Sequence, residues 1–372
     1  MPGFFHFMFA ESHPYIRRII RFCLLPYCYF KLVPWRECPH SRLRVAQDLL
    51  YIFFKFKYYP GNYGLCCLWE KDRSEWAYYY GASYDPYQRQ RLRQLVQRYA
   101  YQIVFDDKEL WEQFCRGLKV PMPAFYGTLE PGGSYRKQIE ICLEKSVGKE
   151  LFIKPIMGRG GKGIMKAVKG RNTIIVKTAS GETDIADFVL TEKCVLQEGV
   201  GQHRAVSQIA PSSVNTIRIV TLLTAGLDVI MLGALMRFSK EGSFVDNTST
   251  GGISIGIDCN KGELREVGFD FSCNTYTKHP DTGFIFAGFT IPFWKEVVGL
   301  AVTVQKSCKF YRLIGVDIAV TPSGPVLIEA NANPDIIGIE QVNGPILADK
   351  MVFDEFAKYG LLVNQYQRVL YD

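Results

Sequence analysis

A glycine-rich loop is the first of two features in this chain whose residues suit chemistry on phosphates. In "LFIKPIMGRGGKGI", residues 151–164, an apolar run ends at Lys154-Pro155, and four glycines follow within six positions, with Arg159 and Lys162 among them. Glycines let backbone N–H groups approach an anion closely because they carry no Cβ. The chain continues into a second strand pattern, "GIMKAV", and lacks the GxxxxGK[ST] spacing of the common phosphate loop. We therefore predict a β-hairpin flap over phosphates; a surface hairpin without a ligand is the alternative.

An acidic hairpin near the C-terminus is the second feature. In "LIGVDIAVTPSGPVLIEANANP", residues 313–334, the turn signal "TPSGP" separates two strand patterns. A hairpin centred on Ser323 sets Asp317 and Glu329 opposite each other, with Asn331 on the same face. Two buried carboxylates repel, and leaving them unpaired costs several kcal/mol. Oxygen ligands of this kind suit Mg²⁺. The pattern predicts a magnesium site, or alternatively a carboxylate pair neutralised by Lys or Arg.

The elements that must position these groups fall into three zones. Residues 1–100 contain helical patterns at 15–25, 42–56 and 85–103, the last beginning with an Asp85-Pro86 helix start. Residues 101–200 alternate strand and helix patterns, with "QIVF" (102–105) predicted as a strand. Residues 201–372 are mostly strand patterns rich in β-branched residues, with one helix near "IPFWKEVVGLAVTVQKS". The expected fold class is α+β with large mixed or antiparallel sheets.

Charge and cysteine content narrow the class of protein. Residues 1–60 hold nine Lys and Arg against three acids, a net +6, and are rich in aromatic residues. This region is predicted to be either a solvated basic face or a peripheral contact with an anionic membrane. Eleven cysteines without CxxC spacing are typical of reduced thiols and predict a cytoplasmic protein, at the inner membrane surface if the basic region binds lipid. No nucleic-acid partner is expected, because no binding motif is present.

Taken together, the flap and the acidic hairpin point to ATP, and the sequence resembles the ATP-grasp superfamily. Within it, the chain is most similar to the sugar-transfer-associated ATP-grasp family. The resemblance runs from about residue 50 to 350 and is strongest in "FDDKELWEQF", "LFIKPIMGRGGKGI", "CVLQEGVGQH", "SSVNTIRIVTLL", "VDNTSTGGISIGID" and "GVDIAVTPSGPVLIEANANP". It implies two β-rich lobes that clamp ATP with Mg²⁺, preceded by a helical N-terminal region.

The resemblance also implies a role for individual residues. Asp317, Glu329 and Asn331 would hold Mg²⁺. Arg237 would stabilise the transferring phosphoryl group and Arg218 a substrate carboxylate or phosphate, while a salt bridge is the alternative for both arginines. Asp246 would shape the acceptor side of the pocket. The residues expected to bind ATP are two lysines, the flap and an inter-lobe hinge whose strand edge is left open toward adenine: Lys108, Lys154, Gly160, Gly161, Lys162, Gly163, Gln197, Glu198 and Gly199.

The activity that the resemblance implies is ligation of a carboxylate to an amine. ATP would activate the carboxylate as an acyl-phosphate, and the amine would displace phosphate to form an amide, with no protein nucleophile. The family description suggests a sugar substrate, such as a uronic acid or an amino sugar in surface polysaccharide synthesis, lipid-linked or nucleotide-linked. A peptide ligase, a phosphoryl transferase and a nucleotide-sensing partner without activity are the alternatives.

Overall fold

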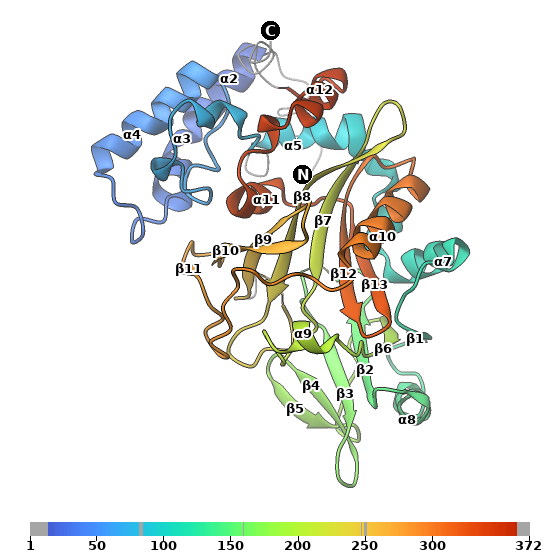
Figure 1. Ribbon diagram of the computed structural model, residues 1–372. Coiled ribbons are helices and arrows are strands. Elements are labelled where there is room, and N and C mark those ends of the chain that lie inside the picture. The colour runs from blue at the N-terminus through green and yellow to red at the C-terminus, as the bar shows by residue number, and fades with distance from the viewer. Residues whose placement is uncertain (1–13, 82–84, 159, 247, 249–250, 363–372) are drawn as a thin grey trace.

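The computed structural model describes residues 14–81, 85–158, 160–246, 248 and 251–362. Within them, the first of two antiparallel sheets has six strands in the order β1-β6-β2-β3-β4-β5 (Figure 1). Helix α8 (Tyr135–Lys145) packs on this sheet and buries Ile139 and Leu143 against it. The strands are β1 (Phe125–Leu129), β2 (Glu150–Pro155), β3 (Met165–Lys169), β4 (Ile174–Thr178), β5 (Gly181–Asp184) and β6 (Cys194–Glu198).

The second sheet has seven strands in the order β11-β10-β9-β8-β7-β12-β13, all in antiparallel pairs within the described ranges. Helix α10 (Trp294–Ser307) covers one face, and α11 (Ile336–Asn343) packs on β8, β9 and β10. The strands are β7 (Ile217–Leu223), β8 (Val229–Phe238), β9 (Ile253–Asp258), β10 (Glu263–Phe269), β11 (Thr275–Tyr276), β12 (Leu313–Thr321) and β13 (Gly324–Asn331).

Helices between and beyond the sheets position the two features that the sequence singled out. Helix α7 (Lys108–Leu118) begins at Asp107, whose carboxylate accepts hydrogen bonds from Glu109 N and Leu110 N at 2.9 and 3.0 Å. The short α6 (Ile103–Asp106) precedes it, α9 (Arg204–Ser207) follows β6, and α12 (Lys350–Lys358) follows α11.

The N-terminal region is helical and is joined to the C-terminal helices. It contains α2 (Pro14–Cys23), α3 (Leu25–Tyr27), α4 (Arg42–Tyr51) and α5 (Pro86–Leu92), with π-helical turns after α3, α4 and α5. Tyr80 N and Gly81 N donate to the carboxylate of Glu340 in α11 at 2.6 and 2.9 Å. Leu92 and Val96 share a hydrophobic cluster with strands β7 and β8. The region is therefore packed into the rest of the molecule.

The α+β fold class is confirmed, and one predicted strand is wrong. "QIVF" forms α6 instead, and Phe105 packs its ring 4.8 Å from that of Tyr311 and 5.3 Å from that of Trp111. Four residues are too few for periodicity to separate a strand from a buried helical turn, and tertiary packing decides. None of the described helices combines the length and apolarity needed to cross a membrane.

Candidate active site

The glycine loop is the predicted hairpin. Strands β2 and β3 pair antiparallel on either side of residues 156–164. Gly160, Gly161 and Gly163 have φ values of +66, +74 and +72°, which favour glycine. A Cβ on Gly163 would lie 2.9 Å from Cγ of Pro155. Arg159 lies outside the described residues. The loop therefore needs its glycines for shape, and phosphate binding by it remains a prediction.

Two lysines meet beneath this loop. Lys154 of β2 donates from Nζ to Oε1 of Gln197 at 2.9 Å, and Lys108 donates from Nζ to the carbonyl oxygen of Gly158 at 2.6 Å. Burial lowers the pKa of both lysines, and Glu329 opposes that shift. Neither ammonium has a carboxylate within 4 Å among the residues that the structure describes. Two half-buried cations that lack an ion-pair partner among the described residues suit an anionic ligand.

The acidic hairpin has the predicted cross-strand pair. Asp317 of β12 lies opposite Glu329 of β13. The route differs from the prediction: Thr321 pairs with Gly324 around a two-residue turn, and a register shift at Ile328 then brings Glu329 opposite Asp317. Asn331 donates from Nδ2 to Asp317 and Glu329 at 3.3 Å each. The three residues assigned to Mg²⁺ by resemblance are thus in contact.

Both predicted catalytic arginines bind Asp317. Arg218 of β7, its cross-strand neighbour, forms a two-pronged ion pair with it, and Nη2 of Arg237 lies 2.9 Å from Oδ2 of Asp317. Burial alone would raise the pKa of Asp317, but the two guanidinium groups hold that pKa well below its usual range. The salt-bridge alternative is therefore the arrangement in this structure, and a direct contact of either arginine with substrate remains a prediction.

The buried network extends to a residue that the sequence did not single out. Thr216 Oγ1 accepts from Nη2 of Arg237 at 2.6 Å and donates to Oδ2 of Asp246 at 2.5 Å. The Thr216 backbone N–H also donates to Asp246, at 2.7 Å. Thr216 thereby fixes the Arg237 side chain between two carboxylates. Its position two residues before Arg218 in "NTIR" was the available signal, but a threonine next to a strand rarely draws attention.

The carboxylate of Glu329 differs from that of Asp317 in its partners. Among the described residues no cation lies within 4 Å of Glu329, whose carboxylate accepts from the Asn331 amide and contacts that of Asp317. A half-buried carboxylate and an adjacent amide form an oxygen-rich donor set that fits Mg²⁺. Asp317 would join such a set only where the arginines release its Oδ2 oxygen, which Arg218 and Arg237 both bind. The residues present therefore fit a Mg²⁺ ion held chiefly by Glu329 and Asn331.

The flap, the lysines and the acidic hairpin line one cavity. Its walls include Lys108, Lys154, Gly160, Gly161, Lys162, Arg237, Asp317 and Glu329. An adjoining cavity shares Lys108, Lys154 and Glu329 and adds Gln197, Asn331 and Trp111. The structure thus brings together segments that lie more than 150 residues apart in the sequence.

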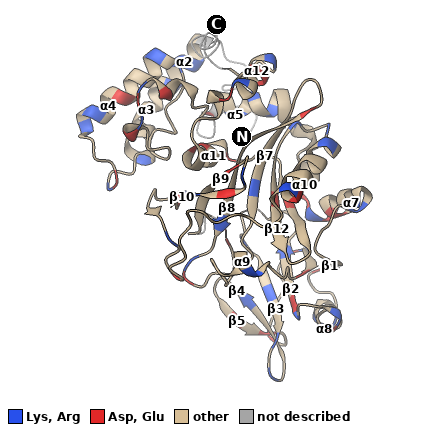
Figure 2. Cartoon of the chain, in the orientation of Figure 1, with Lys and Arg blue, Asp and Glu red and all other residues tan. Residues whose placement is uncertain are grey.

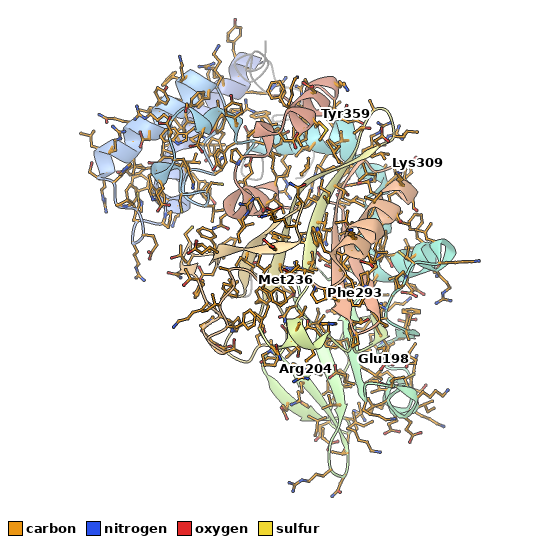
Figure 3. The ribbon with its side chains drawn as sticks, in the orientation of Figure 1. Glu198, Arg204, Met236, Phe293, Lys309 and Tyr359 are labelled. Atoms are coloured by element: carbon orange, nitrogen blue, oxygen red, sulfur yellow. The ribbon has the colours of Figure 1, made fainter. Side chains whose placement is uncertain are left out.

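The predicted open strand edge at Gln197–Gly199 is wrong. Strand β6 pairs with β1 on one side and β2 on the other, and the N–H groups of Glu198 and Gly199 bind the carbonyls of Ala124 and Glu150. The Glu198 carboxylate accepts from Ser146 Oγ at 2.6 Å, Gly148 N at 3.0 Å and the Tyr126 hydroxyl. Glu198 lies at the end of β6 (Figure 3), where it ties β6 to β1 and to the loop after α8. Gln197 still faces the cavity through its side chain.

The fold is similar to those of several solved ligases and synthetases. D-alanyl-alanine synthetase A from Vibrio cholerae O1 biovar eltor shares 14% identity and a TM-score of 0.42, covering 70% of this chain and 66% of that one. VanG D-Ala:D-Ser ligase from Enterococcus faecalis shares 15% identity and a TM-score of 0.40, and the match covers 69% of this chain and 62% of that one. N5-carboxyaminoimidazole ribonucleotide synthetase, solved as its ADP complex, shares 9% identity and a TM-score of 0.38, and the match covers 62% of this chain and 45% of that one. The chain spans between about half and two thirds of these proteins.

A comparison of the sequence with curated proteins finds no match. A family model, described as sugar-transfer associated ATP-grasp, matches residues 87–353. That range contains every cavity-lining residue named above and most of the chain. The chain belongs to the sugar-transfer-associated ATP-grasp family.

Proposed function

We propose that the protein is an ATP-dependent ligase that joins a carboxylate to an amine through an acyl-phosphate, releasing ADP. The observation that carries the proposal is the pair of half-buried lysines that lack carboxylate partners among the described residues and share a cavity with Glu329 beneath a glycine flap. Burial without an ion pair is unfavourable for a lysine, so an anion of high charge is the ligand that this arrangement favours. Membership of the family supports ATP as that anion.

The chain's own residues would act mainly by positioning and by charge. Lys154, held by Gln197, and Lys108, held by the Gly158 carbonyl, would bind phosphate oxygens. The flap would cover the phosphates and keep water from the activated carboxylate. Glu329 and Asn331 would hold Mg²⁺, which when bound neutralises triphosphate charge. Arg237 would stabilise charge on the transferring phosphoryl group once it exchanges Asp317 for substrate.

The substrate class follows the family description and not the cavity. A carboxylate and an amine, one of them on a sugar such as a uronic acid or amino sugar, would be joined during surface polysaccharide synthesis. A cytoplasmic location supplies the ATP that this chemistry needs. The cavity supports an anionic substrate in general terms, because Arg218, Arg237 and Lys162 lie in or beside it.

ADP release across a panel of carboxylate and amine pairs tests the proposal. We expect release that needs both partners, and we expect Glu329→Gln to lose nearly all of it. The matched control is Glu266→Gln, on the exposed face of β10, which should keep wild-type release. Release that needs a carboxylate but no amine would instead favour a phosphoryl transferase, and release only with peptide acids would favour a peptide ligase. Nucleotide binding without ADP release under any pair would contradict an enzymatic role.

A further inference from the structure

The N-terminal helix α2 turns its apolar side outward. From α2 into the turn after α3, the exposed apolar residues recur at helical spacing: Tyr15, Ile16, Ile19, Phe22, Cys23, Pro26, Tyr27 and Phe30. Ile19 is 62% exposed and Phe30 is 65% exposed. A surface helix of a globular protein normally buries its apolar stripe and exposes its polar side. Here the arrangement is inverted.

The polar side of α2 packs on the protein. Nη2 of Arg21 lies 2.8 Å from Oδ2 of Asp85, a fully buried carboxylate, and its guanidinium lies 5.0 Å from the centre of the Tyr87 ring. Arg18 lies in the same way 5.4 Å from the ring of Phe53. These contacts fix the rotation of the helix about its axis, so the apolar stripe is held outward by the arginines.

Helix α4 continues the exposed apolar surface. Leu43, Leu50 and Phe54 are 71%, 40% and 55% exposed, at positions that share one helical side, and Phe54 lies with its ring 6.1 Å from that of Phe22. An apolar groove between the two segments is lined by residues of both, among them Phe22, Pro26, Phe30, Ala46 and Leu50. We call this surface the α2–α4 face. Soluble proteins rarely expose contiguous apolar surface of this kind without a binding partner.

Positive charge surrounds the α2–α4 face. Residues 14–57 carry nine Lys and Arg against Glu37 and Asp48, and the blue of Lys and Arg predominates on these helices in Figure 2. Asp48 is buried and bound by Arg73, so it offers little negative charge to the surface. Lys31, Arg42 and Lys55 are exposed and adjoin Phe30, Leu43 and Phe54 in the chain. Apolar side chains ringed by cations are complementary to an anionic lipid surface.

We propose that the α2–α4 face docks the protein on an anionic membrane surface, with the apolar stripe of α2 and α4 inserted among the lipids and the flanking cations on the headgroups. None of the described helices could span the membrane, so contact would be peripheral. Helices α2 and α4 lie at the opposite end of the molecule from β3, β4 and β5 (Figure 1). Docking would leave the glycine flap free to move, and the proposal does not depend on the ligase activity.

Flotation of the full chain with vesicles tests the proposal. We expect it to float with phosphatidylcholine vesicles that contain phosphatidylglycerol, to float far less with phosphatidylcholine alone, and to be released by salt. The triple variant Ile16→Ser, Ile19→Ser and Phe30→Ser should lose at least about tenfold of vesicle binding. The matched control, Val147→Ser, Val189→Ser and Ile285→Ser, changes apolar residues elsewhere that are at least as exposed, and should stay within about twofold of wild type.

The cations are tested separately. Lys31→Gln and Arg42→Gln should each lower binding to the anionic vesicles by about fivefold. Equal flotation with both vesicle types, or no flotation, would overturn the proposal. So would light scattering that shows a dimer which the triple variant dissociates, since a second copy would then cover the face. Loss of binding on removal of residues 2–13, with the triple variant still bound, would assign the membrane contact to that segment instead.

Discussion

At the scale of single residues, Lys154 is the side chain on which nucleotide binding should depend most. It is half-buried, held by Gln197, and has no carboxylate within 4 Å among the described residues. We expect Lys154→Met to weaken binding of ATP by about ten- to a hundredfold, because a charge-assisted hydrogen bond to phosphate is lost. Titration calorimetry measures this. Lys169→Met, an exposed lysine on the next strand, is the control and should bind normally. Equal affinity in the two variants would remove Lys154 from the nucleotide site.

A second prediction concerns Glu340, the buried carboxyl between α11 and residues 80–81. Burial raises its pKa to about 8, although the N–H groups of Tyr80, Gly81 and Ile346 favour the charged form. The folded protein then keeps a proton that the unfolded chain loses near pH 4.5. The contribution of Glu340 to the free energy of unfolding is therefore largest below pH 4.5. It falls as the pH rises from 4.5 through 8, by up to roughly 5 kcal/mol. Denaturant unfolding between pH 5 and 8 should show this slope in the wild type and a shallower one in Glu340→Gln. Identical slopes would refute it.

What the sequence could reveal at this scale was residue type and local spacing. Asp317, Glu329 and Asn331 lie within one hairpin, so their contact follows from alternation along two adjacent strands. The partner of Asp317 could not be foreseen in the same way. Arg218 is its cross-strand neighbour only because β7 pairs with β12, and strands nearly a hundred residues apart give no local sign of their pairing. The sequence therefore left the magnesium and arginine alternatives open.

At the scale of elements, the flap between β2 and β3 is the part whose shape is most sensitive to substitution. Gly163 has φ of +72°, and a Cβ there would lie 2.9 Å from Pro155 Cγ. We expect Gly163→Ala to leave the melting temperature nearly unchanged, since the loop is peripheral, and to lower ADP release by about tenfold, because the strain of about 1–2 kcal/mol falls on the closed loop. Gly299→Ala in α10, where the added Cβ meets nothing, is the control. Normal release by Gly163→Ala would argue against closure of this loop.

The elements that the sequence predicted well are those with long periodic patterns or local signals. The two hairpins and helix α10 fall in this group. Two predictions were wrong because they depend on distant contacts. The predicted strand "QIVF" forms a helical turn against Trp111 and Tyr311, and the edge of β6 that was predicted to be open is paired, as is its other edge. A single strand pattern does not say whether its edges are paired.

At the scale of the whole molecule, the N-terminal region is a part of the fold and not an appendage. Ile337 of α11 belongs to the same hydrophobic cluster as Phe53 and Trp69, and Arg91 donates to the carbonyl of Gly360. We expect residues 101–372 alone to aggregate, since removal of residues 1–100 would expose α11 and leave Glu340 without two of its donors. Circular dichroism and gel filtration measure this, and co-expression of residues 1–100 should restore a soluble complex. A folded, monomeric fragment of residues 101–372 would contradict this expectation.

The three zones expected from the sequence were drawn from the composition and patterns along the chain. The structure shows in addition how these zones pack against one another. The six-stranded sheet uses residues 125–198 and the seven-stranded sheet residues 217–331, whereas α11 and α12 return to the N-terminal helices. Contacts between the two ends of a chain do not change local periodicity. Composition could therefore predict a boundary near residue 100, but it could not predict that the N-terminal region packs on the C-terminal helices.

The extra residue at Ile328 sets the register of the acidic hairpin at its two carboxylates. The short turn at Pro322-Ser323 alone would place Asp317 across from Ile328, and the bulge corrects this offset by one position. A chain that lost Ile328 would have Glu329 as the next residue after Leu327, so the two acids would stay opposite each other on an unbroken ladder. Loss of the bulged residue is therefore compatible with the acid pair, whereas one more residue between Leu327 and Glu329 would need a wider bulge to keep Glu329 opposite Asp317.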